Sequence, residues 1–139
     1  PGRDFDFDRL AVNVTTAVAS ALAKIVIYST DEMGRPDALL LETGTLDLSA
    51  IGSRTVDATF SLRQGRCYWF GLRHSSTATV SIWQAYATPD INGGTAPSIS
   101  ARKVLRRLVT FGSAAPAAWG FVSAEITATN ASAIWLRRV

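Results

Sequence analysis

Two alternating apolar segments near the middle of the chain constrain its fold most. The first runs from Arg66 to Arg73 and the second from Thr79 to Gln84, with a polar loop of hairpin length between them. Because successive side chains of a strand point to opposite faces, each segment has one apolar face that suits a core. That face consists of Tyr68, Phe70, Leu72, Val80 and Ile82. The pattern therefore predicts a central β-hairpin over residues 66–84.

The other face of this hairpin carries two tryptophans. If the loop closes symmetrically, Trp69 lies opposite Trp83. Three interpretations of the pair stay open: burial by a loop such as residues 85–100 or by a different register, burial at a subunit interface, and a platform for a sugar ring. Arg73, His74 and Tyr86 stand at the edge of such a platform. The candidate ligand-binding residues are Trp69, Trp83, Arg73, His74 and Tyr86.

Short segments of strand character recur along the rest of the chain. Asp4 to Asp8 alternates strictly, and the apolar parity changes after Arg9, which predicts a bulge there. Further predicted strands are Ala23–Tyr28, Leu39–Leu46, Thr55–Leu62, Phe121–Thr127 and Ala133–Arg138. Residues 85–100 contain Pro and Gly-Gly and are predicted to form a long surface loop. This regular spacing of short strands and turns predicts an all-β fold, an antiparallel sandwich or barrel, in a single domain over residues 1–139.

Residues 101–109 fit both a helical and an extended pattern. Apolar residues recur at helical spacing from Ala101 to Leu108, whereas alternation from Val104 to Thr110 fits a strand. Because the rest of the chain is all-β, we predict an extended segment. Trp119 and Trp135, the two tryptophans outside the hairpin, are predicted to lie in the core or at an interface.

Composition narrows the classes of function. The net charge of +3 is too small and too dispersed to argue for nucleic-acid binding. The only cysteine, Cys67, excludes an intramolecular disulfide and a cysteine-based zinc site, and its aromatic neighbours predict a small packed residue. The most apolar stretch, Ala17 to Tyr28, is too short to span a membrane and contains Lys24. We therefore expect neither a nucleic-acid partner nor membrane insertion.

No motif in the sequence predicts catalysis. The one histidine, His74, stands beside two serines, but no nucleophile-elbow motif accompanies it. The three aspartates of residues 4–8 have a spacing that suits a glycosidase pair, although a solvated strand edge is the more ordinary interpretation. The acidic turn at residues 31–37 lacks the spacing of an EF-hand loop. The basic cluster at residues 102–107 suits a solvated or salt-bridged face. We expect no enzymatic activity, no cofactor and no metal site.

Several segments of the chain follow one another in a definite order. They are Phe7-Asp8-Arg9-Leu10, a Val-Asn-Val-Thr-Thr strand from Val12, Ile25–Tyr28, the acidic Gly-Arg-Pro turn Asp31–Pro36, Leu39–Asp47, Gly65–Trp69 and Ala133–Arg137. This order resembles the distal domain of bacteriophage tail fibres and related virion fibre proteins. The resemblance implies a jelly-roll-like β-sandwich that forms a homotrimer. It also implies assembly in the host cytoplasm and a place at the virion surface, in a tail or head fibre.

The expected function follows from the resemblance and from the predicted tryptophan pair. It is a virion surface domain for host attachment, which recognises a host-surface glycan and contacts other virion proteins. The alternative is a structural decoration protein of the capsid or tail, with no receptor-binding activity.

Overall fold

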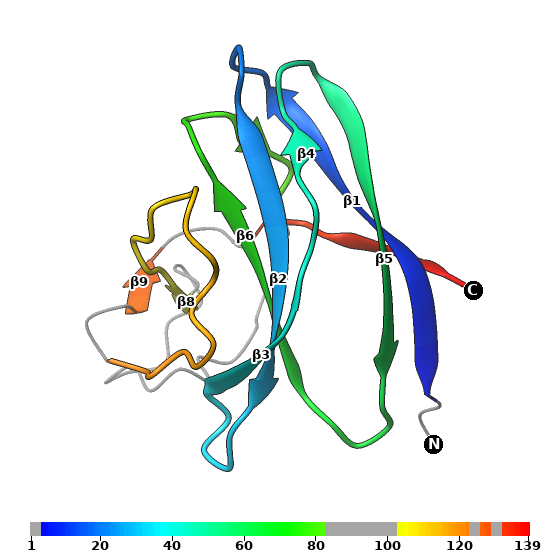
Figure 1. The fold of residues 1–139 in the computed structure, drawn as a ribbon, viewed down its shortest axis with the longest axis vertical. Coiled ribbons are helices and arrows are strands. Elements are labelled where there is room, and N and C mark those ends of the chain that lie inside the picture. The colour runs from blue at the N-terminus through cyan, green and yellow to red at the C-terminus, as the bar shows by residue number, and fades with distance from the viewer. Residues whose placement is uncertain (1–3, 83–102, 123–125, 129–131) are drawn as a thin grey trace.

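A computed structural model describes residues 4–82, 103–122, 126–128 and 132–139 of this chain. These residues form strands and no helix, and the two large sheets are antiparallel and make a sandwich (Figure 1). The strands are β1 (Phe5–Thr16), β2 (Leu22–Thr30), β3 (Pro36–Glu42), β4 (Leu46–Asp47), β5 (Gly52–Leu62), β6 (Tyr68–His74), β7 (Thr79–Val80), β8 (Lys103–Leu105), β9 (Ile126–Ala128) and β10 (Trp135–Arg138). The predicted all-β sandwich is confirmed. Within the described part of the chain, no helix is long and apolar enough to cross a membrane.

The first sheet is built around β1. One side of β1 pairs with β5, and its other side pairs with β10 and, further along, with β7. The register shifts between Phe7 and Arg9 against both β5 and β10, so the predicted bulge is confirmed. Between these two positions β1 has one residue more than β10 and one fewer than β5. The alternation of β1 changes there, so Phe7 before the shift and Leu10 after it both point into the core.

The second sheet is built around β2. One side of β2 pairs with β6, and β3 and β4 share its other side. The predicted strand Leu39–Leu46 is therefore wrong as a single strand, because β3 ends at Glu42 and β4 begins at Leu46. Thr43 bridges the gap: its backbone N–H donates to the Ile25 carbonyl at 2.9 Å, and its hydroxyl accepts the Ile25 N–H at 2.9 Å. A side chain thus continues the hydrogen bonding where the strand is interrupted.

The predicted hairpin over residues 66–84 is wrong in its pairing. β6 pairs with β2 in the second sheet, whereas β7 pairs with β1 in the first, so the connecting loop crosses between the sheets. Tyr28 lies opposite Trp69 in the register, and Trp83 lies outside the described residues. Alternation fixes which face of a strand is apolar, but it does not fix which strand lies alongside. The predicted apolar face is correct for Tyr68, Phe70, Leu72 and Val80, which pack against the core between the sheets. It is wrong for Ile82, which is 42% exposed beyond the end of β7.

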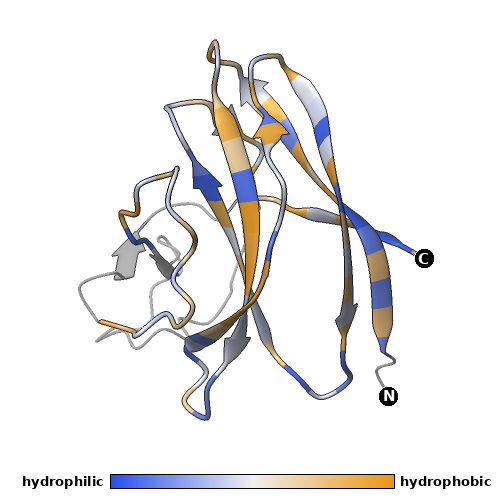
Figure 2. Ribbon diagram, viewed as in Figure 1, coloured by the Kyte–Doolittle hydropathy of each residue, from blue (hydrophilic) through white to orange (hydrophobic). Residues whose placement is uncertain are grey.

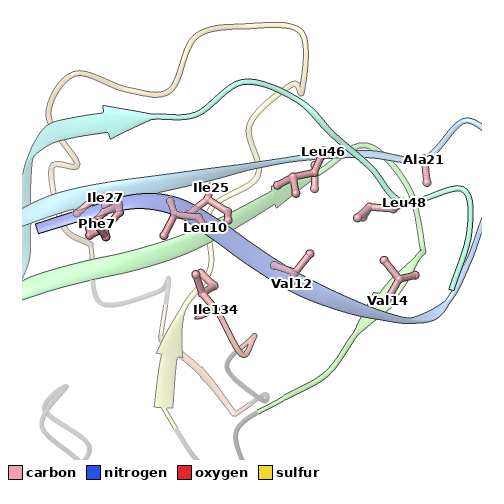
Figure 3. Packing of buried hydrophobic residues seen from close by; sticks show 11 residues of the cluster. Phe7, Leu10, Val12, Val14, Ala21, Ile25, Ile27, Leu46, Leu48 and Ile134 are labelled. Carbon is pink, nitrogen blue, oxygen red and sulfur yellow. The ribbon is translucent and has the colours of Figure 1, made fainter. Parts of the chain in front are cut away.

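That core fills the space between the two sheets (Figure 3). Its fully buried side chains are Phe7, Leu10, Val12, Val14, Ile25, Ile27, Leu46 and Leu48. Figure 2 shows that β2 is hydrophobic along most of its length. The reason is that β2 is covered on both faces: Ile25 and Ile27 enter the core, while Val26 and Tyr28 are buried on the outer side. A strand covered on both faces is expected to be continuously apolar.

The other predicted elements agree with the structure in part. β2 and β5 contain the predicted strands Ala23–Tyr28 and Thr55–Leu62, and β10 begins two residues inside Ala133–Arg138. The extended conformation predicted for residues 101–109 is found in β8, which pairs with β9, but residues 106–110 belong to no strand. The predicted strand Phe121–Thr127 is described only in part, with β9 beginning at Ile126. The predicted loop at residues 85–100 lies outside the described residues.

Candidate functional site

Trp69 lies half-buried on the outer face of the second sheet. Its indole N–H donates to the Gly34 carbonyl at 3.1 Å, and its ring packs against a small cluster that includes Val26 and Tyr28. Trp119 packs against the same cluster and meets the Tyr28 ring edge-on at a centroid distance of 5.2 Å. For Trp69, the structure therefore favours the interpretation that a loop covers it. That loop is residues 106–122, which we call the cover segment; Figure 1 shows it beside β6 and β2, on the side away from β1 and β5.

Arg73 holds the cover segment to the sheet. Its guanidinium forms an ion pair with Glu42 and donates to the Thr110 carbonyl at 3.1 Å and to the Ser113 carbonyl at 2.8 Å. Only 13% of the Arg73 side chain and 17% of the Glu42 side chain is exposed. A planar guanidinium suits such divergent acceptors, since it presents five donors in a fixed geometry. Arg73 therefore links the second sheet to the cover segment.

Glu42 is the carboxylate that pairs with Arg73. Its other oxygen accepts the Ala115 N–H at 3.0 Å, and the Lys24 ammonium lies 3.5 Å from the oxygen that faces Arg73. Burial by itself raises the pKa of Glu42, but the Ala115 hydrogen bond and the charges of Arg73 and Lys24 outweigh it and lower the pKa below its ordinary value of 4.5. We call Glu42, Arg73 and Lys24 the ionic clasp.

Backbone and phenol hydrogen bonds complete the attachment of the cover segment. Trp119 donates its backbone N–H to the carbonyl of Asp37, the second residue of β3, at 2.7 Å. The Tyr28 hydroxyl donates to the Pro116 carbonyl at 2.9 Å. Burial raises the pKa of the Tyr28 phenol above its ordinary value of 10.0. These bonds close the outer face of the second sheet around Trp69.

The other predicted site residues do not join Trp69 and Arg73. His74 ends β6 in an exposed position, with its Nδ1 2.6 Å from the Ser76 carbonyl oxygen. Trp83 and Tyr86 lie outside the described residues. Of the five candidates, Trp69 and Arg73 both lie on β6 beneath the cover segment. Arg73 bonds to that segment, and Trp69 packs against the cluster that contains Ala115.

The aspartates at the beginning of β1 each have a structural partner. Asp4 accepts the Gln64 N–H at 2.8 Å and an Arg63 hydrogen bond at 2.8 Å, and these two bonds, the first in particular, lower the pKa of Asp4. Asp8 forms a two-pronged ion pair with Arg137, at 2.7 and 2.5 Å, which lowers the pKa of Asp8. These carboxylates therefore connect β1 to the turn after β5 and to β10.

Cys67 is exposed, which corrects the expectation of a packed residue. It precedes the first residue of β6, where the chain leaves the turn from β5 and does not yet share the alternation of the strand. Among the residues that the structure describes, no group of three or more His, Cys, Asp and Glu side chains could hold a metal ion.

The sequence predicts Trp135 in the core or at an interface. The structure shows that it is outside the core of this chain, because 42% of it is exposed. β10 pairs with β1 so that Leu136 enters the core and Trp135 lies opposite Ala11 on the outer face of the first sheet. Alternation in Ala133–Arg138 is a signal that separates these two faces.

Polar side chains surround Trp135 on the neighbouring rows of this sheet. Thr55 follows Ala11 in the same row across β5, and Asn13 lies in the next row, where its amide donates to the Ser81 hydroxyl at 2.8 Å. We call this surface, made of Ala11, Asn13, Thr55, Ser81 and Trp135, the Trp135 face.

The fold and this geometry together define the class: an antiparallel β-sandwich with one outer face closed by the cover segment and an aromatic side chain exposed on the other. No protein-family model matches the chain, and no curated protein or solved structure matches it either.

Proposed function

We propose that this chain is a non-enzymatic surface domain of a bacteriophage virion, which attaches the particle to its host by recognising a glycan. The order of sequence segments that resembles fibre domains supports the phage assignment, and a β-sandwich suits it. The observation that carries the binding role is the contrast between the two outer faces. Arg73 holds the cover segment on the second sheet and Trp69 packs against the cluster beneath it, whereas Trp135 is 42% exposed on the first sheet.

The ionisable side chains that catalysis would use are bonded to other groups of the protein, and this favours binding over catalysis. Asp4 and Asp8 are paired with arginines, and the His74 ring is bonded to a nearby carbonyl. A general acid, base or nucleophile has to reach a substrate atom, and these groups are directed at the protein instead.

We propose that the domain acts as a homotrimer in a tail or head fibre. A single exposed aromatic side chain supports only weak sugar binding, and joining copies in one particle compensates for it. Effective concentration raises the avidity of linked sites by about 10²–10⁴-fold over one site. A trimeric fibre therefore suits a domain with a shallow binding surface.

A structural decoration role is the second candidate, and one feature favours it. The cover segment exposes apolar side chains, with Leu108 86% exposed and Val122 54% exposed. Apolar residues gathered on a surface are typical of a contact with another protein. On this alternative the cover segment faces a neighbouring virion protein and no receptor is bound.

A binding experiment with the whole chain separates the two candidates. Purified chain is applied to a glycan array and to a panel of bacterial cells, before and after periodate oxidation of the cell-surface sugars. Attachment that periodate abolishes, together with selective array binding, supports glycan recognition. Binding only to virions that lack this protein supports decoration and contradicts the attachment role.

A further inference from the structure

We infer that the ionic clasp makes the attachment of the cover segment sensitive to acid. When Glu42 takes up a proton, the cover segment leaves the second sheet and uncovers Tyr28 and Trp69, while the sandwich stays folded. This inference does not depend on the proposed function. Three features of the described residues carry it: the contacts of Glu42, the chemistry of the other ionisable groups beside the cover segment, and the separate apolar cluster beneath it.

The first feature is that Glu42 joins the sheet to the cover segment through its charge. One of its oxygens faces Arg73 and Lys24, and the other accepts the Ala115 N–H at 3.0 Å. A protonated carboxyl group is uncharged, and one of its oxygens becomes a donor. Protonation therefore removes the counter-charge of two cations whose side chains are 13% and 25% exposed. Two shielded cations without a counter-charge favour a state in which water solvates them.

Both of these cations also contact the cover segment. Arg73 donates to the Thr110 carbonyl at 3.1 Å and to the Ser113 carbonyl at 2.8 Å, and the Lys24 ammonium lies 5.8 Å from the centroid of the Phe111 ring. Neither cation is able to turn fully to water while these contacts persist. Solvation of the two cations thus loosens the cover segment where it lies over the clasp.

The second feature is that the other ionisable groups packed against the cover segment respond differently to acid. Burial raises the pKa of the Tyr28 phenol above 10.0, so this group stays protonated. The guanidinium groups of Arg35 and Arg107 lie 4.7 Å from the centroids of aromatic rings of the cover segment and keep their charge at all these pH values. Asp37 contacts the cover segment through its backbone carbonyl, which does not titrate. Of these groups, Glu42 is the one whose contact depends on the charge of a carboxylate.

The third feature is that the apolar contacts of the cover segment are separate from the main core. Val26, Tyr28 and Ala115 are buried together on the outer side of the second sheet, with Trp69 and Trp119 packed against them. The main core lies between the two sheets and is made of other side chains. It keeps its contacts when the cover segment leaves, so we expect the release to be local.

Two backbone hydrogen bonds allow the release to be measured. Leu39 of β3 donates its N–H to the Ala117 carbonyl at 2.8 Å, and Trp119 donates its N–H to the Asp37 carbonyl at 2.7 Å. Both bonds break if the cover segment leaves while β3 stays in its sheet. Leu10, in the central strand of the first sheet, is the reference.

The test is hydrogen exchange of the whole chain, followed by NMR at about pH 6.5 and about pH 3, with each rate divided by its intrinsic value at that pH. We expect the protection of the Leu39 and Trp119 amides to fall at least about threefold in acid relative to that of Leu10. A threefold change corresponds to about half a pKa unit between the released and the attached state.

A matched pair of variants assigns the effect to Glu42. Glu42→Gln removes the titrating carboxylate and should give low protection at Leu39 and Trp119 already at about pH 6.5, with no further loss in acid. Asp57→Asn breaks the exposed pair with Arg9 in the first sheet, and it should keep the acid effect unchanged.

A disulfide that ties the cover segment to β3 gives an independent check. Ala38 and Ala118 lie opposite each other as an antiparallel bridge, and the two bonds of Leu39 and Trp119 flank them. Such a non-hydrogen-bonded pair has Cα atoms about 4.5 Å apart, within the range of a disulfide. The variant combines Ala38→Cys and Ala118→Cys with Cys67→Ser, which removes the exposed native thiol. The acid effect should disappear in the oxidised variant and return on reduction.

Three outcomes would overturn the inference. They are an equal loss of protection at Leu10, which means global unfolding, an acid effect of full size in Glu42→Gln, and an acid effect that persists in the oxidised disulfide variant. If Glu42→Gln does not fold, the comparison of the oxidised with the reduced variant decides. Glycan recognition is tested separately by the array and by periodate treatment, so failure of one proposal is distinguishable from failure of the other.

Discussion

At the scale of single residues, the neighbours of a side chain determine what it contributes to stability. Glu42 illustrates this, because it receives hydrogen bonds or charge from a lysine, an arginine and a backbone N–H in a setting where little of its side chain is exposed. Removing one partner from a buried pair leaves the other charge poorly solvated, and this costs more than the pair contributes.

Glu42→Gln is therefore expected to lower the free energy of unfolding by about 2–3 kcal/mol near neutral pH, since Arg73 and Lys24 lose their counter-charge. The measurement is urea unfolding at equilibrium. Asp57→Asn is the matched control, because it breaks the exposed pair with Arg9, and it should cost less than about 1 kcal/mol. Equal costs for the two variants would contradict the role of the ionic clasp.

Glu42 also makes the stability of the fold depend on pH in acid. The pKa of Glu42 is lower in the folded chain than its ordinary value of 4.5, so the unfolded chain takes up the proton first as pH falls. The stability that Glu42 contributes is thus complete above pH 4.5 and is lost as pH falls below 4.5 through the lowered pKa. We expect the difference in unfolding free energy between the unchanged chain and Glu42→Gln to shrink over that window, as followed by urea unfolding at a series of pH values.

Gly71 shows a second residue-scale constraint. A Cβ placed on Gly71 would lie 3.0 Å from the Cγ2 of Val26, which is 3% exposed and has few rotamers to move to. Gly71→Ala should lower the free energy of unfolding by about 1–2 kcal/mol through overpacking. Gly44→Ala is the control, because its Cβ would meet Val56 at an ordinary 3.7 Å. Comparable thermal stability of the two variants would contradict this contact.

At the scale of elements, the cover segment is joined to the second sheet by a few specific groups. Tyr28 and Trp119 supply the apolar contact, and Arg73 supplies hydrogen bonds to two carbonyls of the segment. An element attached in this way is able to open without unfolding of the sandwich, as in other proteins with local unfolding units.

Arg73→Ala is expected to release the cover segment locally. The backbone N–H of Trp119, bonded to Asp37, should exchange with solvent about tenfold faster or more, while Leu10 in β1 keeps its protection. Arg63→Ala is the control, since it breaks an exposed pair with Asp4 in the first sheet. Hydrogen exchange followed by NMR measures both sites. Uniform acceleration at Trp119 and Leu10 would mean that the cover segment and the sandwich unfold as one unit.

At the scale of the whole molecule, we propose that copies of the chain associate. The sequence resemblance implies a homotrimer, and the described surface includes apolar side chains such as Ile51, which is 70% exposed, and Leu40, which is 41% exposed. Burying such side chains between copies is favourable at about 25 cal/mol per Å² of apolar surface removed from water.

We expect light scattering to give a mass three times that of the 14.9 kDa chain at micromolar concentration. A variant with Leu40→Glu and Ile51→Glu replaces two exposed apolar side chains with charged ones and should lower the mass, whereas Thr59→Glu on the exposed face of β5 should leave it unchanged. A mass equal to one chain for the unchanged protein would count against the trimer and favour the decoration role.

The sequence by itself determined the fold class and the faces of its strands. Alternation in β1 and β6 identified Phe7 and Phe70 as core-facing, and the parity change at Arg9 located the bulge, because both are local properties of an extended backbone. Turn residues separated the strands for the same reason.

Only the tertiary structure decided which strands lie side by side and which aromatic side chain stays exposed. The partner of Trp69 depends on the path of a four-residue loop, residues 75–78, between two sheets, and its cover depends on residues 106–122, far away in the sequence. Pairing is set by contacts summed over the whole core, which a local pattern does not contain. Trp69 is therefore half-buried and Trp135 is 42% exposed, although both tryptophans lie in strands with the same alternation.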